Sequence, residues 1–137
     1  MPNKISYSTD TAGINWDRLK SALRRDQFDN GRSPEQLRAS FENSRHCVFA
    51  WRDGELIGTA RALSDGVCNA YVVDVWTSGT HRRQGVATGM LQHLLSRLAG
   101  EHVVLFADDA EELYRKLGFV EQPAGFSQVV GRWLNPA

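Results

Sequence analysis

Residues 46–77 contain three consecutive strand-like runs that are separated only by short turn sequences. Asp53-Gly54 lies between the first two runs and accepts the positive φ angles of a tight hairpin turn. Ser64-Asp65-Gly66 turns the chain between the second and the third. Connections this short join antiparallel neighbours, so we expect a three-stranded antiparallel meander. Its predicted strands are His46–Arg52, Glu55–Leu63 and Cys68–Thr77.

The segments around the meander carry helical and strand-like patterns. Apolar residues recur at intervals of three and four over residues 87–98, which predicts a helix with one buried face, ended by Gly100. Ser33 and Pro34 are a suitable N-cap and first residue for another helix, with Gln36 completing a capping box. The other predicted elements are a strand over 4–8, a helix over 15–25, a strand over 102–107 covered on both faces, a short helix capped by Asp108 or Asp109 and ending at 117–118, and two last strands over 119–121 and 126–133.

Together these elements predict a single α/β (α+β) domain over residues 1–137. The chain of 137 residues is long enough for one hydrophobic core and too short for two domains. The expected order is β-α-α-β-β-β-α-β-α-β-β, with a mixed central sheet of about seven strands and helices on both faces.

Composition excludes several kinds of partner. Sixteen basic and sixteen acidic side chains give a formal net charge of zero, so no overall field gathers nucleic acid or an anionic membrane. Cys47 and Cys68 lack a metal-binding spacing and fall in predicted strands, which favours buried thiols and no metal site. The sequence has no signal-peptide core and no apolar run long enough to cross a membrane. We therefore expect a soluble protein of the cytoplasm.

The stretch from His81 to Met90, HRRQGVATGM, places two arginines and a glycine directly before the predicted helix of residues 87–98. The first N–H groups of a helix have no partner within it, and that end carries partial positive charge, so a small-residue loop there can hold a phosphate. The alternative is a simple turn at Gly85 with a solvated arginine pair. The spacing is neither a Walker loop nor a GxGxxG fingerprint.

Two motifs in this order resemble the GNAT superfamily of acyl-CoA N-acyltransferases. The first is Arg82-x-x-Gly85-x-Ala87 after a strand, and the second is LYRKLGF at residues 113–119. Residues 58–66 and 105–108 further resemble the small bacterial and plant-type aralkylamine N-acetyltransferases. The resemblance implies a GNAT-like fold and acetyl-CoA as co-substrate.

The resemblance also implies where coenzyme A binds. The pyrophosphate is expected on the backbone amides of the loop, and the pantetheine arm along the preceding strand, where an amide chain pairs with free backbone groups between two splayed strands. Ala107 stands where many relatives carry an asparagine that contacts the coenzyme. The implied coenzyme-binding residues are Val75, Trp76, Thr77, Arg82, Arg83, Gln84, Gly85, Val86, Ala87 and Thr88.

Acetyl transfer to an amine also requires an acid and a base. The phenol of Tyr114, with an ordinary pKa of about 10, stays protonated at neutral pH and is expected to protonate the leaving thiolate. Asp74 lies in an apolar strand beside the expected acetyl position, where burial can raise a carboxylate's pKa, and is the candidate base. Ordered water, His46 and His81 are alternatives. From the turn at 64–67, Arg61 is expected nearer Ala70 than Asp74.

The resemblance also implies that the two early helices, the loop between them and the last hairpin form the acceptor pocket. Their aromatic residues would line it or simply pack the core, and the acidic residues Asp26, Asp29 and Glu42 would attract a cationic amine or lie in solvent. The predicted reaction is transfer of acetyl from acetyl-CoA to a primary amine of a small molecule by a monomer or homodimer. A coenzyme-A-binding module with little catalysis, and an acetyltransferase for protein N-termini or lysines, remain alternatives. The aromatic residues are Trp16, Phe28, Phe41, Phe126 and Trp133.

Overall fold

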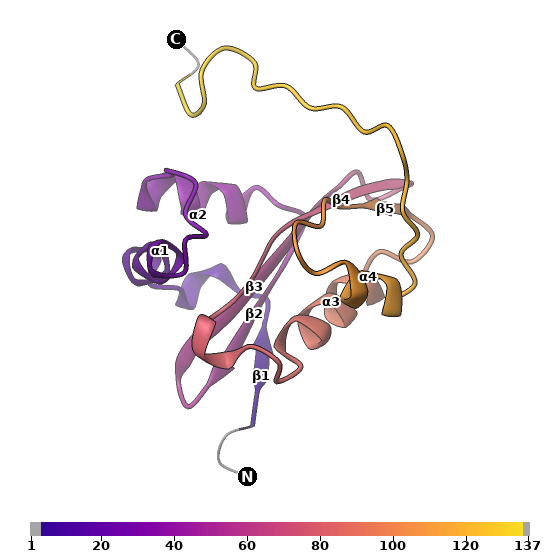
Figure 1. Cartoon of the computed structure of the whole chain (residues 1–137). Helices are drawn as coiled ribbons and strands as arrows, with labels where there is room; N and C mark the ends of the chain where they lie inside the picture. The colour runs from indigo at the N-terminus through magenta and orange to yellow at the C-terminus, as the bar shows by residue number, and fades with distance from the viewer. Residues whose placement is uncertain (1–3, 136–137) are drawn as a thin grey trace. The chain divides into compact units, whose positions relative to one another are not determined.

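The structure is a computed structural model that describes residues 4–135 (Figure 1). The chain forms two compact units that divide between Phe106 and Ala107. The expectation of one domain over residues 1–137 therefore stays a prediction.

A five-stranded mixed sheet, in the order β1-β2-β3-β4-β5, is the centre of the first unit. Strands β1 to β4 pair antiparallel, and β5 pairs parallel to β4. The meander is confirmed, including the tight turn at Asp53 and Gly54, whose φ angles are 52° and 77°. The strands are β1 Ser6–Ser8, β2 His46–Arg52, β3 Glu55–Ser64, β4 Asn69–Thr77 and β5 His102–Val104.

Helices α1 (Trp16–Arg25) and α2 (Pro34–Glu42) cover one face of this sheet, and α3 (Val86–Ser96) covers the other (Figure 1). Helix α2 begins with the predicted capping box, in which Ser33 and Gln36 each bond the other's backbone N–H. Short 3₁₀ helices over Thr11–Gly13 (η1) and Gly79–His81 (η2) precede α1 and α3.

Alternate residues of the strands fill two apolar layers. On the α1/α2 face, Phe41 and Phe49 lie 5.6 Å apart between ring centroids, in a cluster that includes Trp76. On the α3 face, close packing depends on glycine: a Cβ at Gly58 would lie 3.0 Å from the sulfur of Met90. The apolar helix faces predicted from periodicity thus pack on opposite sides of one sheet and form two cores.

Strand β4 is irregular at Asp74. Arg61 pairs with Val73 and Thr59 with Trp76, so two residues of β4 lie opposite one residue of β3. Asp74 has a φ of 56°, a left-handed conformation that aspartate tolerates better than most residues. This β-bulge switches the alternation of side chains and turns Asp74 toward the α1/α2 face.

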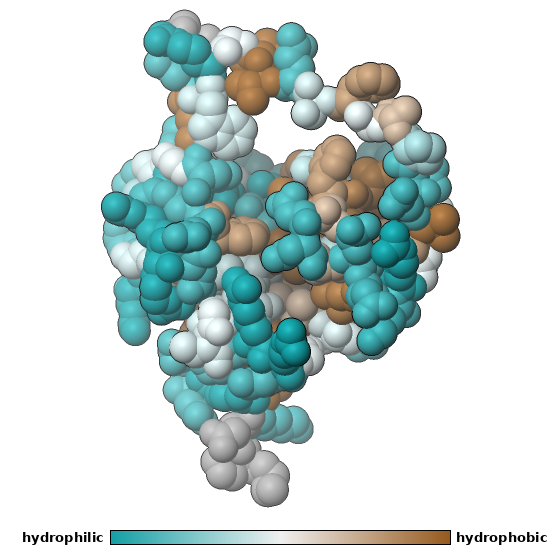
Figure 2. Space-filling model, viewed as in Figure 1, coloured by the Kyte–Doolittle hydropathy of each residue, from teal (hydrophilic) through white to brown (hydrophobic). Residues whose placement is uncertain are grey.

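The second unit contains helix α4 (Glu111–Lys116) followed by an extended segment. The two last predicted strands are wrong: among residues 119–135, the only β pairing is an isolated bridge between Arg132 and Asn135. Phe126 and Val130 are 93% and 84% exposed, and hydrophobic side chains stand uncovered along this segment (Figure 2). A strand forms only when a partner satisfies its backbone, which β-type composition alone does not supply.

Several smaller predictions also need correction. The sheet has five strands rather than about seven. Strand β5 is shorter than predicted and not covered on both faces, since Val104 is 42% exposed. Helix α4 is capped by Ala110 rather than by Asp108 or Asp109, and α3 ends at Ser96, before the expected stop at Gly100. Cys47 is buried as expected, but Cys68 is exposed.

Candidate functional site

The loop between β4 and α3 has the backbone shape of an anion site. Arg83 has a φ of 62°, and Gly85, the N-cap of α3, has a φ of 81°. Left-handed residues in a tight turn can direct neighbouring N–H groups toward the same side of the chain. Gly85 is suited to this position because glycine adopts a positive φ without steric cost.

The N–H groups of this loop are free to bind. Within residues 4–135, no peptide N–H from Arg82 to Thr88 donates to a protein acceptor, and the first helical hydrogen bond of α3 is from Gly89 N to Gly85 O at 3.0 Å. Arg82, Arg83, Gln84 and Gly85 are exposed, whereas Val86 is buried and fixes the start of the helix to the core. Ala87 and Thr88 are half-buried. The arrangement can hold a phosphate group by backbone donors with two arginines at hand.

Contacts from α1 hold the beginning of this loop. Asp26, which caps the C-terminus of α1, accepts hydrogen bonds of 3.0 Å from Trp76 Nε1 and from Gly79 N. Arg25 donates to Ser78 Oγ at 3.2 Å. Burial would raise the pKa of Asp26, but its hydrogen bonds from Arg25, Gly79 and Trp76 together lower it. Asp26 was predicted only as a solvated or amine-attracting acid, because its partners are some fifty positions away in the sequence.

One edge of β4 is unpaired next to this loop. Strand β5 pairs with β4 only as far as Tyr71, whose partner is Val104. From Val72 to Thr77, no strand in the described part of the chain pairs with β4 on the β5 side. The predicted pantetheine-binding residues lie in this stretch: Trp76 is buried, and Val75 and Thr77 are half-buried. Free backbone groups here can accept an added extended chain.

Asp74 lies in a buried ionic cluster beside the same stretch. Its carboxylate accepts bonds of 2.8 and 3.0 Å from the two terminal nitrogens of Arg32 and a bond of 2.6 Å from Arg61 Nε. The side chains of Asp74, Arg32 and Arg61 are 10%, 6% and 12% exposed. Thr59 Oγ1 donates to Asp74 O at 3.0 Å, which fixes the bulge itself.

The contacts of this cluster differ from two expectations drawn from the sequence, on the pKa of Asp74 and on the position of Arg61. Burial would raise the pKa of Asp74, as predicted, but the hydrogen bonds and charges of Arg32 and Arg61 outweigh burial and lower the pKa. The expectation that Arg61 lies nearer Ala70 than Asp74 is wrong, because Ser64 and not Arg61 pairs with Ala70 and because the bulge turns Asp74 toward Arg61. An aspartate held ionised in this way is a weak proton acceptor.

Tyr114 lies on α4 in the second unit. It is 9% exposed, and its ring meets that of Phe119 edge to face with centroids 5.9 Å apart. Burial raises the pKa of the phenol, and the negative charges of Asp109 and Asp108 raise it further. The phenol therefore remains protonated well above neutral pH.

The other candidates occupy different surroundings. His46 begins β2, far along the sheet from the loop, and His81 ends η2 and bonds Thr80 Oγ1 at 3.0 Å. Trp16 and Phe41 belong to the core, which confirms the packing alternative for these two, while Phe28, Phe126 and Trp133 are exposed. Asp29 pairs with Lys20 at 3.1 Å and Glu42 with Arg38 at 2.9 Å. Each of these carboxylates is thus already paired with a cationic side chain.

Comparison with known proteins links this fold to acetyltransferases. The structure superimposes on a GNAT-family acetyltransferase from Xanthomonas campestris with a TM-score of 0.81 at 20% identity, covering 95% of this chain and 96% of the other. A probable acetyltransferase from Staphylococcus aureus gives a TM-score of 0.80 at 18% identity, covering 95% and 100%. These likenesses show the fold. A histone acetyltransferase of Glycine max is 38% identical over 74 residues, which are 51% of this chain and 32% of that protein.

The match to a family model shows the class of protein to which this chain belongs. A model of the acetyltransferase (GNAT) family matches residues 15–119, and the chain belongs to this family. The family uses acetyl-CoA as the acetyl donor. The chain spans only about a third of the length of the plant relative. In the described residues, no helix is long and apolar enough to cross a membrane, and no group of three His, Cys, Asp or Glu side chains is arranged to hold a metal ion.

Proposed function

We propose that this protein transfers the acetyl group of acetyl-CoA to a primary amine of a small molecule. The observation that carries the proposal is the set of unpaired N–H groups from Arg82 to Thr88, directly after a strand whose β5 side is open from Val72 onward. The loop would bind the pyrophosphate, with Arg82 and Arg83 adding charge. Backbone groups of Val75 to Thr77 would hold the pantetheine arm, which presents the thioester near the bulge at Asp74.

In the proposed reaction the neutral amine attacks the thioester carbonyl carbon directly. A new carbon–nitrogen bond forms, the carbon–sulfur bond breaks, and the amine proton passes to water. Tyr114 would donate a hydrogen bond to the departing thiolate. A phenol with a raised pKa is a weaker acid than an ordinary thiol of pKa about 8.5, so complete transfer of the phenol proton to the thiolate is unfavourable. Tyr114 would therefore stabilise the thiolate through the hydrogen bond before any proton is transferred.

We assign Asp74 a positioning role in this reaction, in place of general base. Its carboxylate is already shared by two guanidinium groups, and its left-handed backbone forms the bulge that shifts the register between β3 and β4. Holding that bulge would set the direction of the free backbone groups that follow. Water remains the proposed base.

Binding of the coenzyme is the first test. Acetyl-CoA at a hundred times its Kd should stabilise the protein by about 2.7 kcal/mol and raise Tm, because it binds only the folded state. Arg82→Glu should abolish most of this shift, since it places a negative charge beside the pyrophosphate. Arg24→Glu, on the exposed surface of α1, is the control and should retain the shift. An absence of any shift in the unchanged protein would count against coenzyme binding at this loop.

The acceptor is tested by thiol release across a panel of amines. The panel contains tryptamine, a polyamine, free amino acids and a lysine peptide. The peptide is included because one relative is named a histone acetyltransferase, and turnover with the peptide alone would favour a protein acceptor. Coenzyme binding without turnover of any amine would favour a binding module. The aralkylamine subgroup, the cytoplasmic location, the monomeric or dimeric state, and the absence of nucleic-acid and membrane partners remain predictions.

A further inference from the structure

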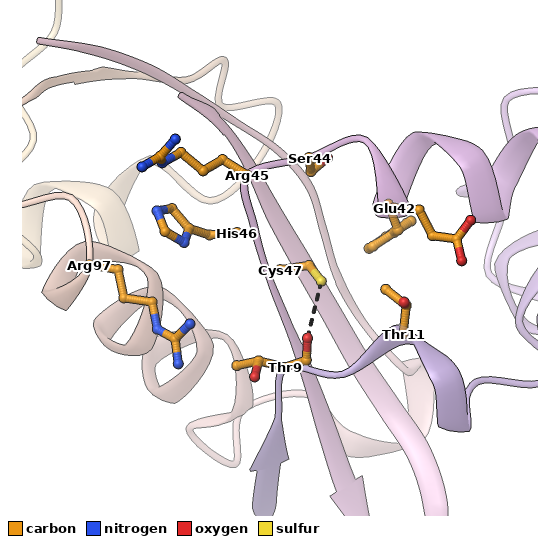
Figure 3. A pocket seen from close by; sticks show the side chains of 9 residues that line it. Thr9, Thr11, Glu42, Ser44, Arg45, His46, Cys47 and Arg97 are labelled. Atoms are coloured by element: carbon orange, nitrogen blue, oxygen red, sulfur yellow. Dashed lines mark hydrogen bonds between the residues drawn. The ribbon is translucent and has the colours of Figure 1, made fainter. Parts of the chain in front are cut away.

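A pocket of about 330 Å³ opens at the beginning of β2, and we call it the distal pocket (Figure 3). Strand β1 pairs only with Phe49 to Trp51, so the first residues of β2 have no strand beside them on that edge. The pocket occupies this edge. The pocket lies at the end of β2 opposite Arg52. The side chain of Arg52 bonds Gln84 of the loop between β4 and α3, so the pocket is separate from the proposed coenzyme site.

Two arginines without partners line the distal pocket. Arg45 precedes β2 and Arg97 follows α3, and neither guanidinium makes a hydrogen bond or ion pair with any residue of the described chain. In Figure 3 both lie on the same side of β2, with the His46 ring between them. Gly66 leaves room for Arg45, since a Cβ there would lie 2.7 Å from the guanidinium carbon. By contrast, Arg61 nearby is fully engaged with Asp74 and Ser44.

The positive charges of Arg45 and Arg97 both act on the imidazole of His46. The pKa of His46 is lowered by burial and then by Arg45 and Arg97, while Glu101 opposes them. Positive charge from two separate elements thus converges at the imidazole. Arg97 also complements the C-terminus of α3, but this does not account for Arg45.

Negative groups near the pocket only partly balance these charges. Glu42 lines it, but its carboxylate is bound to Arg38 at 2.9 Å and lies across β2 from His46 (Figure 3). Glu101 accepts a hydrogen bond from Ser64 Oγ. Asp10, whose charge acts on Cys47 of the pocket, accepts a hydrogen bond of 2.9 Å from Ala12 N. All three carboxylates thus already have a partner, whereas neither guanidinium group does among the described residues.

We propose that the distal pocket binds a small molecule through a carboxylate or phosphate group, held between Arg45 and Arg97 beside His46. Arginine binds such planar or tetrahedral oxyanions with parallel hydrogen bonds. The Thr9 and Thr11 hydroxyls provide further polar contacts, and Phe41 supplies an apolar wall. The volume lies at the lower end of the range for ligand pockets, which suits a small metabolite rather than a peptide. This inference does not depend on the proposed acetyl transfer.

Residue-specific NMR titration with malonate and, separately, with inorganic phosphate tests the proposal. Sodium chloride at equal ionic strength is the reference. The amide signals of Arg45, His46, Cys47 and Arg97 should shift and saturate with at least one of the two anions. The pKa of His46 should rise in the bound state, because a nearby anion stabilises the imidazolium. Saturation by malonate alone identifies a carboxylate site, and saturation by phosphate alone a phosphate site.

Variants distinguish the pocket from the loop. The double change Arg45→Gln with Arg97→Gln should weaken binding at least tenfold, and Arg97→Gln alone should weaken it in a protein that has lost only one surface charge. Arg24→Gln removes the same charge from α1 and should bind normally. Phosphate bound at the loop between β4 and α3 would instead shift the amide signals of Gly85 to Thr88. The titration therefore reports on the loop and on the distal pocket separately. Shifts no larger than those with chloride, or equal affinity in the double variant, would overturn the proposal.

Discussion

Arg61 Nε donates a 2.6 Å hydrogen bond to Asp74 Oδ2, although Arg61 pairs with Val73 in the β3–β4 register. The β-bulge makes this contact possible, because it brings two neighbouring side chains of β4 to the same face. Arg32, from the segment before α2, completes the cluster. One irregular residue thus connects the sheet to the helices of the α1/α2 face at the edge of the proposed acetyl site.

Replacing Asp74 by asparagine should destabilise the protein by about 3 kcal/mol, because two buried guanidinium groups lose the carboxylate that they share. Asparagine has nearly the same size as aspartate and also tolerates a positive φ angle. Asp53→Asn is a matched control, since Asp53 also has a positive φ but lies exposed in a turn. Denaturant unfolding measures both. Equal stabilities for the two variants would contradict a structural role of the cluster.

The difference in stability between the unchanged protein and Asp74→Asn should depend on pH in one direction. The pKa of Asp74 is lowered on folding, so its carboxylate stabilises the folded state fully above the unfolded value of about 4. The contribution is lost as pH falls through the lower folded pKa. Unfolding of both proteins from pH 2 to pH 7 should show a constant difference above pH 5 and a shrinking one below pH 4. A decline between pH 5 and pH 7 would instead indicate a raised pKa.

Replacing Tyr114 by phenylalanine should lower kcat by about a hundredfold, the range found when a hydrogen-bond donor to developing negative charge is removed. KM for acetyl-CoA should stay within about twofold, because the phenol acts on the leaving sulfur and not on ground-state binding. Tyr71→Phe is the control, since that ring packs edge to face on Phe106. Steady-state kinetics with an amine found in the panel provides the measurement. Unchanged kcat in Tyr114→Phe would reject the assignment.

Asp26→Ala should raise KM for acetyl-CoA by about tenfold, or about 1.4 kcal/mol. The change removes the acceptor for Gly79 N and Trp76 Nε1, so the loop before α3 loses its anchor. We expect kcat at saturating coenzyme to change little, since the reacting groups stay in place. Asp17→Ala on the exposed side of α1 should leave both constants unchanged. A fall in kcat with constant KM would contradict an anchoring role.

Gly89→Ala should destabilise the protein by about 2 kcal/mol, even though alanine favours a helix over glycine by about 1 kcal/mol. A Cβ at this position would lie 1.9 Å from the hydroxyl of Tyr7, so either the Tyr7 ring must leave its place against His93 or α3 must move away from β1. Gly13→Ala has open space around its Cβ and serves as the control. Thermal unfolding compares the two. A gain in stability at position 89 would show that Tyr7 turns aside freely.

The local signals of the sequence determined the meander, the capping box of α2 and the loop that enters α3. Each depends on residues within a few positions of one another: Asp53 with Gly54, Ser33 with Gln36, and Gly85 with the helix after it. Positive φ, capping and helical periodicity are short-range properties, so they can be inferred before the chain is folded. The two terminal strands were wrong because a strand needs a partner that residues 119–135 do not supply in this structure.

Tertiary structure alone decided the surroundings of Asp74, Asp26 and Arg97. A single extra residue in β4 reversed which face Asp74 occupies. The segment before α2 brought Arg32 to the carboxylate of Asp74, whereas Arg97, after α3, has no hydrogen-bond or ion-pair partner among the described residues. The chemistry of an ionisable group depends on what lies within a few ångströms of it, and no local pattern fixes those distances.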